Sequence, residues 1–219
     1  MVLCRKRLIL TIIALVLILS SCSSSINVTD CNGNVSIRYT NKSSFDTGAD
    51  LLPYLSENEL FEQADYIFSG VITDIKNIDI DFDGKHTYKS LLSIRIDELY
   101  KGDYVDLELT VLAPPISRSY RTEDQDLLQA LEKGSIGLFM VSAVSDGTYL
   151  SDNGCSFDAS EICDSKLSDG LRFGFLRNND DSIECCDTLS NSDTKVFGSL
   201  KQYNWDSLIE YVSNMLSTK

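Results

Sequence analysis

The chain has 219 residues, of which 43% are hydrophobic, and a formal net charge of -14. This length allows one domain with a sizeable core and an extension. The first 21 residues hold three basic and no acidic side chains, so the rest carries 16 Lys and Arg against 33 Asp and Glu, a net charge of -17. Such an acidic surface repels nucleic acid and anionic headgroups, which argues against nucleic-acid binding.

The chain begins with a positively charged patch and an apolar run. Arg5, Lys6 and Arg7 precede Leu8 to Leu19, a run that only Thr11 interrupts. A bilayer core requires roughly 20 apolar residues, so this run is too short for a permanent transmembrane helix. It has the length of the apolar region of a secretory signal peptide, which predicts export and removal of residues 1–21.

The junction after this run, Leu19-Ser20-Ser21-Cys22, resembles the bacterial lipobox. The resemblance implies that Cys22 is diacylated and becomes the first residue of a lipoprotein held at the extracytoplasmic face of the cell membrane. Two or three acyl chains would fasten the chain firmly, because each buried methylene contributes ~0.8 kcal/mol. The alternative is an ordinary signal peptide cleaved between residues 20 and 25.

Residues 22–48 are rich in Ser, Asn and Thr, which predicts a tether, although the stretch NVSIRYT can form a short strand. A short helix follows. Ser56 and Glu59 form a capping box, and Leu60, Phe61 and Ala64 supply its apolar face.

The periodicity then changes to two, which indicates strands over residues 66–82, 87–100 and 104–113. Asp83-Gly84 joins the first two as a tight hairpin turn, and Lys101-Gly102-Asp103 joins the second and third. Three consecutive strands with short connections predict an antiparallel meander.

Pro114-Pro115 ends this sheet. A helix is expected near Glu123 to Lys133 and an apolar strand near Ile136 to Val144. The predicted fold class is therefore mainly β with flanking helices: an OB-like five-stranded antiparallel barrel in a domain over residues 49–153.

Three motifs carry a second resemblance. Ala64-Asp65 opens the first strand, Tyr100-Lys101-Gly102 ends the second, and Lys133-Gly134 precedes the apolar strand. This pattern resembles bacterial exported domains of the netrin-like, or tissue-inhibitor-of-metalloproteinases-like, OB fold. The resemblance implies a fold and supplies no active residue, because those inhibitors bind zinc through a free amino-terminal cysteine and Cys22 would be acylated.

Residues 154–219 are expected to form an irregular, cysteine-containing extension and a C-terminal amphipathic helix. Cys155, Cys163, Cys185 and Cys186 fall within 32 residues, which in an exported protein favours local disulfides over free thiols or a metal site and leaves Cys31 without a partner. In the helix, Asn204 is placed to cap the N-terminus. The apolar stripe of Leu208, Ile209, Val212, Met215 and Leu216 predicts docking on the body.

Few residues point to chemistry. His86, the single histidine, follows a turn and is expected to be exposed. Asp79, Asp81 and Asp83 match the first positions of a calcium loop, but Ser90 replaces the glutamate required at position twelve. Because Ile78, Ile80 and Phe82 alternate with the aspartates, a hairpin is the preferred interpretation and a calcium site the alternative.

The sequence thus predicts a non-enzymatic binding or interaction module on the cell surface, in contact with the membrane through its lipid and with an unknown protein or small molecule. No cofactor is expected apart from the calcium alternative. The alternative function is an envelope hydrolase or protease inhibitor with unidentified residues.

Overall fold

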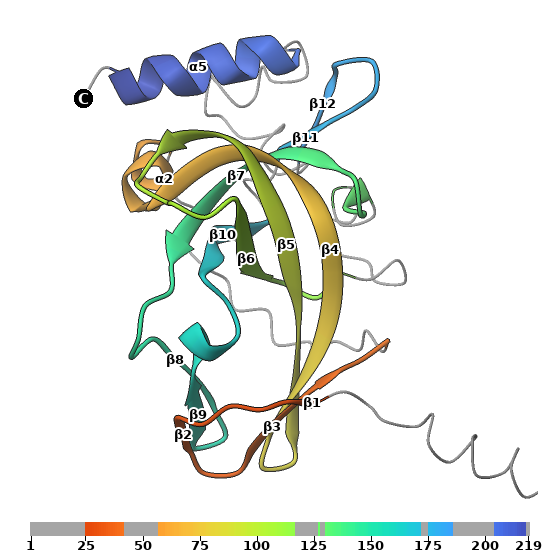
Figure 1. Ribbon diagram of the computed structural model, residues 1–219, viewed down its shortest axis with the longest axis vertical. Coiled ribbons are helices and arrows are strands. Elements are labelled where there is room, and N and C mark those ends of the chain that lie inside the picture. The colour runs from red at the N-terminus through yellow and green to blue at the C-terminus, as the bar shows by residue number, and fades with distance from the viewer. Residues whose placement is uncertain are drawn as a thin grey trace, which may run out of the picture.

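The computed structural model describes residues 25–41, 57–116, 127, 130–171, 175–185 and 204–217. Within these ranges the protein is mainly β, with a C-terminal helix (Figure 1). The elements in chain order are β1 (Ser25–Ile26), β2 (Cys31–Asn32), β3 (Val35–Tyr39), α2 (Glu57–Gln63), β4 (Tyr66–Phe82), β5 (Lys85–Lys101), β6 (Glu108–Ala113), β7 (Ile136–Ala143), β8 (Tyr149–Asp152), β9 (Cys155–Asp158), the short 3₁₀ helix η1 (Ala159–Glu161), β10 (Ser165–Leu171), β11 (Phe175–Arg177), β12 (Ile183–Cys185) and α5 (Trp205–Ser217).

The predicted meander is confirmed. β4 pairs antiparallel with β5, and β5 pairs antiparallel with β6. The first hairpin turns at Asp83 and Gly84, whose φ angles are 51° and 91°. Both residues are therefore left-handed, as a two-residue type I′ turn requires, and the Asp-Gly signal correctly located the turn.

The meander closes into a ring through strands that lie much later in the chain. The predicted apolar strand forms as β7 and pairs with β4, and β10 lies between β6 and β7, parallel to β6 and antiparallel to β7. The ring order among the described residues is therefore β4-β5-β6-β10-β7, with β7 returning to β4.

The barrel domain was predicted to end at residue 153, but β10, which completes the ring, lies beyond that boundary. Its sequence, SKLSDGL, belongs to the segment expected to be irregular, and it lacks the alternation of β-branched and aromatic residues that indicates a strand. Ser165 pairs with both Val111 and Ala143, so the strand is specified by the two backbones that flank it. The same segment supplies β9, β11 and β12.

Residues 25–41 of the predicted tether are also part of the folded body. β3 pairs with the far end of β4, and β1 pairs with β3. β2 joins β9 and β8 in a separate three-stranded sheet. Alternation places Ile37 in the core with an exposed fraction of 1%, and that apolar contact explains why a polar stretch becomes ordered.

Three apolar clusters form the core among the described residues. One lies inside the ring and includes Phe68, Ile94 and Phe139. The second packs β3, β4 and β5 against the small sheet, and the third lies beneath α2 and α5 at the opposite end (Figure 1).

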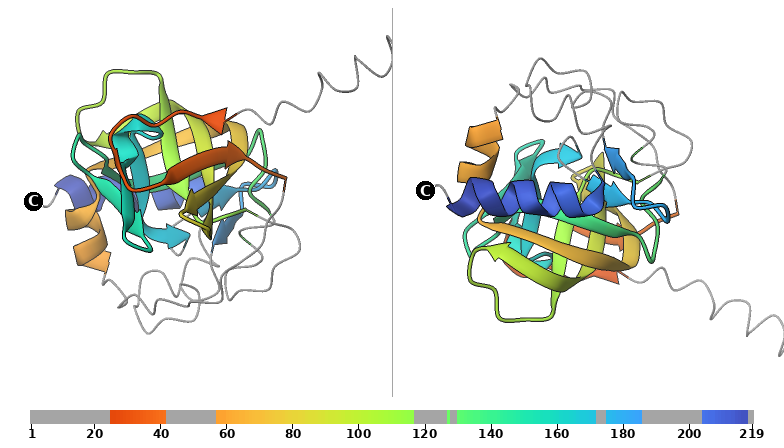
Figure 2. Two further views of the ribbon diagram at one scale, coloured as in Figure 1. Left: turned by 90° about the horizontal axis from the view of Figure 1, so that it is seen from below. Right: turned by 90° about the horizontal axis from the view of Figure 1, so that it is seen from above.

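The predicted docking of the C-terminal helix is confirmed, because Trp205, Leu208 and Val212 are buried on its inner face. The Asn204 cap is also confirmed, since its side-chain oxygen accepts a hydrogen bond from the Ser207 backbone N–H at 3.0 Å. Figure 2 shows α5 lying across this end of the molecule.

Only part of the helix predicted near residues 123–133 can be compared with the structure. Leu127 and Ala130 are helical, and the Leu131 N–H donates to the Leu127 carbonyl at 3.0 Å. Both leucines are buried against the ring core. Within the described ranges, no helix combines the length and apolar character needed to cross a membrane.

Candidate functional site

The three aspartates of the calcium alternative do not converge in the structure. Asp79 is buried and lies 3.3 Å from an Arg38 nitrogen and 2.7 Å from His86 Nδ1. Asp81 accepts a hydrogen bond from the Gly84 N–H at 2.7 Å, and Asp83 is a turn residue. These carboxylates stabilise the hairpin, and no group of His, Cys, Asp and Glu suited to a metal ion lies within the described residues.

His86 is exposed, as predicted. Besides its hydrogen bond with Asp79, it stacks on Tyr88 with ring centroids 6.4 Å apart. Arg38, Asp79 and Tyr88 are cross-strand partners on β3, β4 and β5. The sequence did not reveal this surface cluster, because the partners come from three strands.

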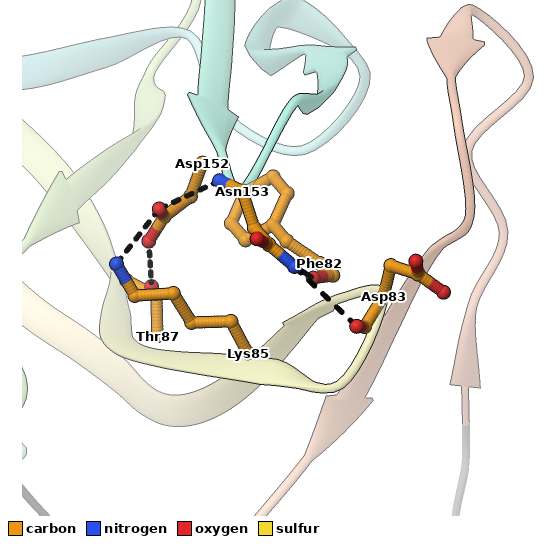
Figure 3. Close-up of polar contacts among 6 residues, drawn as sticks. All are labelled: Phe82, Asp83, Lys85, Thr87, Asp152 and Asn153. Atoms are coloured by element: carbon orange, nitrogen blue, oxygen red, sulfur yellow. Dashed lines mark hydrogen bonds and ion pairs between the residues drawn. The ribbon is translucent and has the colours of Figure 1, made fainter.

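The tip of the same hairpin is held by a second hairpin (Figure 3). The Asp152 carboxylate lies 2.9 Å from Lys85 Nζ and accepts a hydrogen bond from the Thr87 hydroxyl at 3.3 Å. Asn153 Nδ2 donates to the Phe82 carbonyl at 3.1 Å. Asn153 and Gly154 have positive φ angles of 48° and 76°, so an Asn-Gly turn was the available sequence signal for this second hairpin.

The cysteines differ from the predicted disulfide cluster. Cys155 and Cys163 are buried free thiols that pack with Phe157 in one apolar cluster, whereas Cys185 on β12 packs with the α5 cluster. The two locations belong to different parts of the core, and none of the described cysteines is in a disulfide. Cys31 is an exposed free thiol. Cys186, Cys22 and the predicted signal peptide lie outside the described residues.

Burial lowers the expected reactivity of Cys163. It raises the pKa of the Cys163 thiol to about 12, and the charge of Asp164 contributes in the same direction. The sulfur donates to the Ala159 carbonyl at 3.4 Å. Because the thiolate is the reactive form, this side chain serves the core and is not a nucleophile.

A surface hollow of about 440 Å³ lies between the ring and α5. Strands β4, β5 and β11 form part of its wall, and the first turns of α5 form the rest. Its lining combines aromatic, cationic and anionic groups: Ser69, Glu98, Tyr100, Arg177, Trp205, Asp206, Ile209 and Glu210.

Two sets of contacts fix the polar groups of this hollow. The Tyr100 hydroxyl donates to Glu98 at 3.0 Å and lies 3.2 Å from the Ser69 hydroxyl. Burial raises the pKa of Tyr100, so the phenol remains a hydrogen-bond donor. The Arg177 guanidinium of β11 lies 5.9 Å from the centre of the Trp205 ring of α5 and pairs with Asp181 at 2.7 Å.

Sequence reasoning did not identify this site, because its residues are dispersed from position 69 to position 210. The one available signal was Trp205, the single tryptophan of the chain, at the start of the amphipathic helix. Comparison with known proteins adds no assignment, since no family model, curated protein or solved structure matches this chain.

Proposed function

We propose that this protein is an exported, lipid-anchored binding module that performs no catalysis itself. The observation that carries the binding proposal is the hollow, in which residues distant in sequence bring hydrogen-bonding, aromatic and charged side chains to one depression. Binding sites typically combine a concave surface with a few oriented polar groups. The Tyr100 and Arg177 contacts orient two such groups.

The proposed anchor is Cys22. Its support is the apolar leader followed by Leu19-Ser20-Ser21-Cys22. The acidic body has no electrostatic attraction for anionic lipid, so attachment would depend on the acyl chains.

We also propose that the five-stranded ring is an OB-like barrel, as the netrin-like resemblance implies. That fold has a meander of three strands, a helix and two further strands. The ring strands β4, β5, β6, β7 and β10 follow this order, with helical residues 127 and 130 between β6 and β7, and with β8 and β9 inserted between β7 and β10. The pairing of β10 between β6 and β7 supports the proposal. OB barrels are frequent binding scaffolds, although the fold alone does not identify a ligand.

The lining of the hollow favours a ligand with a positive charge. Glu98, Asp206 and Glu210 contribute three carboxylates, whereas Arg177, the one cation among the described lining residues, is already paired with Asp181. The adjacent Trp205 and Tyr100 rings suit a ligand that also has an apolar or aromatic portion. A short cationic peptide segment fits this chemistry.

The emission of Trp205 reports directly on this proposal. Titration of the mature protein with the tripeptide Lys-Ala-Lys should change the emission saturably, whereas Glu-Ala-Glu should not. Glu98→Gln and Glu210→Gln should each weaken binding by up to about fivefold, as expected for partly exposed ion pairs. Asp103→Asn, which changes an exposed carboxylate outside the hollow, is the matched control. The same change in emission with both peptides, or no change with either peptide, would contradict a cationic ligand.

A further inference from the structure

The folded body begins very close to the proposed lipid. β1 starts at Ser25, three residues after Cys22, and pairs with β3 so that Ile26 lies opposite the buried Ile37. Three residues span at most about 11 Å even when fully extended. A membrane that holds Cys22 would therefore lie within about this distance of β1.

The N-terminal segment cannot easily detach to lengthen this connection. The Glu161 carboxylate accepts hydrogen bonds from the backbone N–H groups of Thr29 at 2.6 Å and Asp30 at 2.7 Å. The Tyr149 hydroxyl donates to the Asp30 carboxylate at 2.7 Å. β2 then pairs with β9, so separating the segment would break charge-assisted hydrogen bonds and a strand pairing together.

The hollow lies at the other end of the molecule. Figure 1 shows β1, β2, β8 and β9 at one end of the longest axis and α5, which forms part of the hollow, at the opposite end. A folded body of about 190 residues has a radius of gyration of ~16 Å, so its two ends are roughly 40 Å apart.

We infer that the end formed by β1, β2, β8 and β9 faces the membrane surface and that the hollow faces away from it. This inference rests on the proposed acylation of Cys22. The net charge of -17 outside the leader supports it, because an acidic body is repelled from anionic lipid and remains upright on a short connection. The hollow is then open to ligands that approach from outside the membrane.

Energy transfer from tryptophan to a lipid headgroup dye tests this orientation. The full-length lipidated protein is reconstituted into phosphatidylcholine vesicles that contain dansyl-phosphatidylethanolamine. The native Trp205 probes the hollow. In a Trp205→Phe background, Ser151→Trp and Asn34→Trp probe the opposite end, both at exposed positions. Val105→Trp is the matched exposed control on the β5–β6 loop, which starts beside α2 and stands out from the body (Figure 2).

The two probes at positions 151 and 34 should transfer most of their excitation to the dye, and Trp205 and Val105→Trp should transfer little. Urea unfolding confirms that each variant is folded. Because two independent probes lie at the membrane end, the test can still be made if one of these variants does not fold. If the protein floats with the vesicles but Trp205 or Val105→Trp transfers more energy than the two probes at the membrane end, the orientation is overturned. The anchor is not affected by that result. Protein that does not float with the vesicles would overturn the anchor and, with it, the orientation.

Discussion

The Lys101 ammonium donates a hydrogen bond to the Phe61 carbonyl at 2.6 Å and so ties the end of β5 to the last turn of α2. The same ammonium also donates to the carbonyls of Glu62 and Ala64. A cation at the C-terminus of a helix satisfies carbonyls that lack intrahelical partners. Lys101 of the Tyr100-Lys101-Gly102 motif therefore has a structural role, whereas Tyr100 lines the hollow and Gly102 lies against Tyr66 of β4.

Gly102 is predicted to tolerate no side chain. Its φ is 95°, and a Cβ would lie 2.4 Å from a Tyr66 ring carbon. Gly84 has a similar φ of 91°, but a Cβ added there would have no atom within 4 Å. Gly84→Ala should cost only the left-handed strain of roughly 1–2 kcal/mol, and Gly102→Ala should add an overpacking cost of roughly 1–3 kcal/mol. Urea unfolding compares the two, and equal costs would contradict the crowding.

The docked face of α5 should contribute strongly to stability. Leu208 is fully buried, so Leu208→Ala should lower the free energy of unfolding by roughly 2–5 kcal/mol. Ser213→Ala on the exposed face should change it by less than about 0.5 kcal/mol. Chemical denaturation of both variants provides the comparison. A small effect at position 208 would mean that the helix is not docked in solution.

Glu161 should make the attachment of the N-terminal segment sensitive to acid. Hydrogen bonds from the Asp30 and Thr29 N–H groups lower the pKa of Glu161 below its ordinary value of 4.5. A lowered pKa in the folded state means that the stabilisation is complete well above pH 4.5 and is lost as the pH falls through the folded value.

The measurement for Glu161 is the urea midpoint as a function of pH. The urea midpoint of the wild type should fall as the pH is lowered below about 5. The midpoint of Glu161→Gln should be lower than that of the wild type at neutral pH and should fall less on acidification. Asp103→Asn, at an exposed loop position, should follow the wild type. If Glu161→Gln and the wild type have parallel pH profiles, the contact does not stabilise the folded state.

The cysteines should differ sharply in alkylation. In the native protein at pH 8, exposed Cys31 should react quickly with iodoacetamide. Buried Cys155 and Cys163 should react slowly, because only about one Cys163 in ten thousand is a thiolate when its pKa is about 12. Site-resolved mass spectrometry reads each position, and unfolding in urea should abolish the difference. Recovery of Cys155 or Cys163 in a disulfide with Cys185 or Cys186 would contradict the structure.

Acylation of Cys22 remains a prediction with its own measurement. A clickable fatty acid should label the wild type and not Cys22→Ser, and the labelled protein should stay with membranes in high salt because its attachment is hydrophobic. The variant should be found either released or as the uncleaved precursor, which differ in mass by the 21-residue leader. Equal labelling of both proteins would exclude the lipoprotein assignment.

Local patterns alone located the meander, its Asp83-Gly84 turn, the apolar strand β7 and the docked helix α5. Each of these elements is specified by neighbours in sequence: alternation at a period of two, a turn that requires positive φ, or an apolar stripe at helical spacing. The Asn153-Gly154 turn contained the same kind of signal for β8 and β9.

Only the tertiary structure determined the place of β10, the ordering of residues 25–41 and the composition of the hollow. Ser165 occupies its strand because Val111 and Ala143 present backbone groups on both sides. Ser69, Tyr100 and Arg177 meet because ring closure and helix docking bring β4, β5 and β11 beside α5. Such contacts join residues far apart in the chain, and their energies depend on packing and pairing that no local sequence pattern encodes.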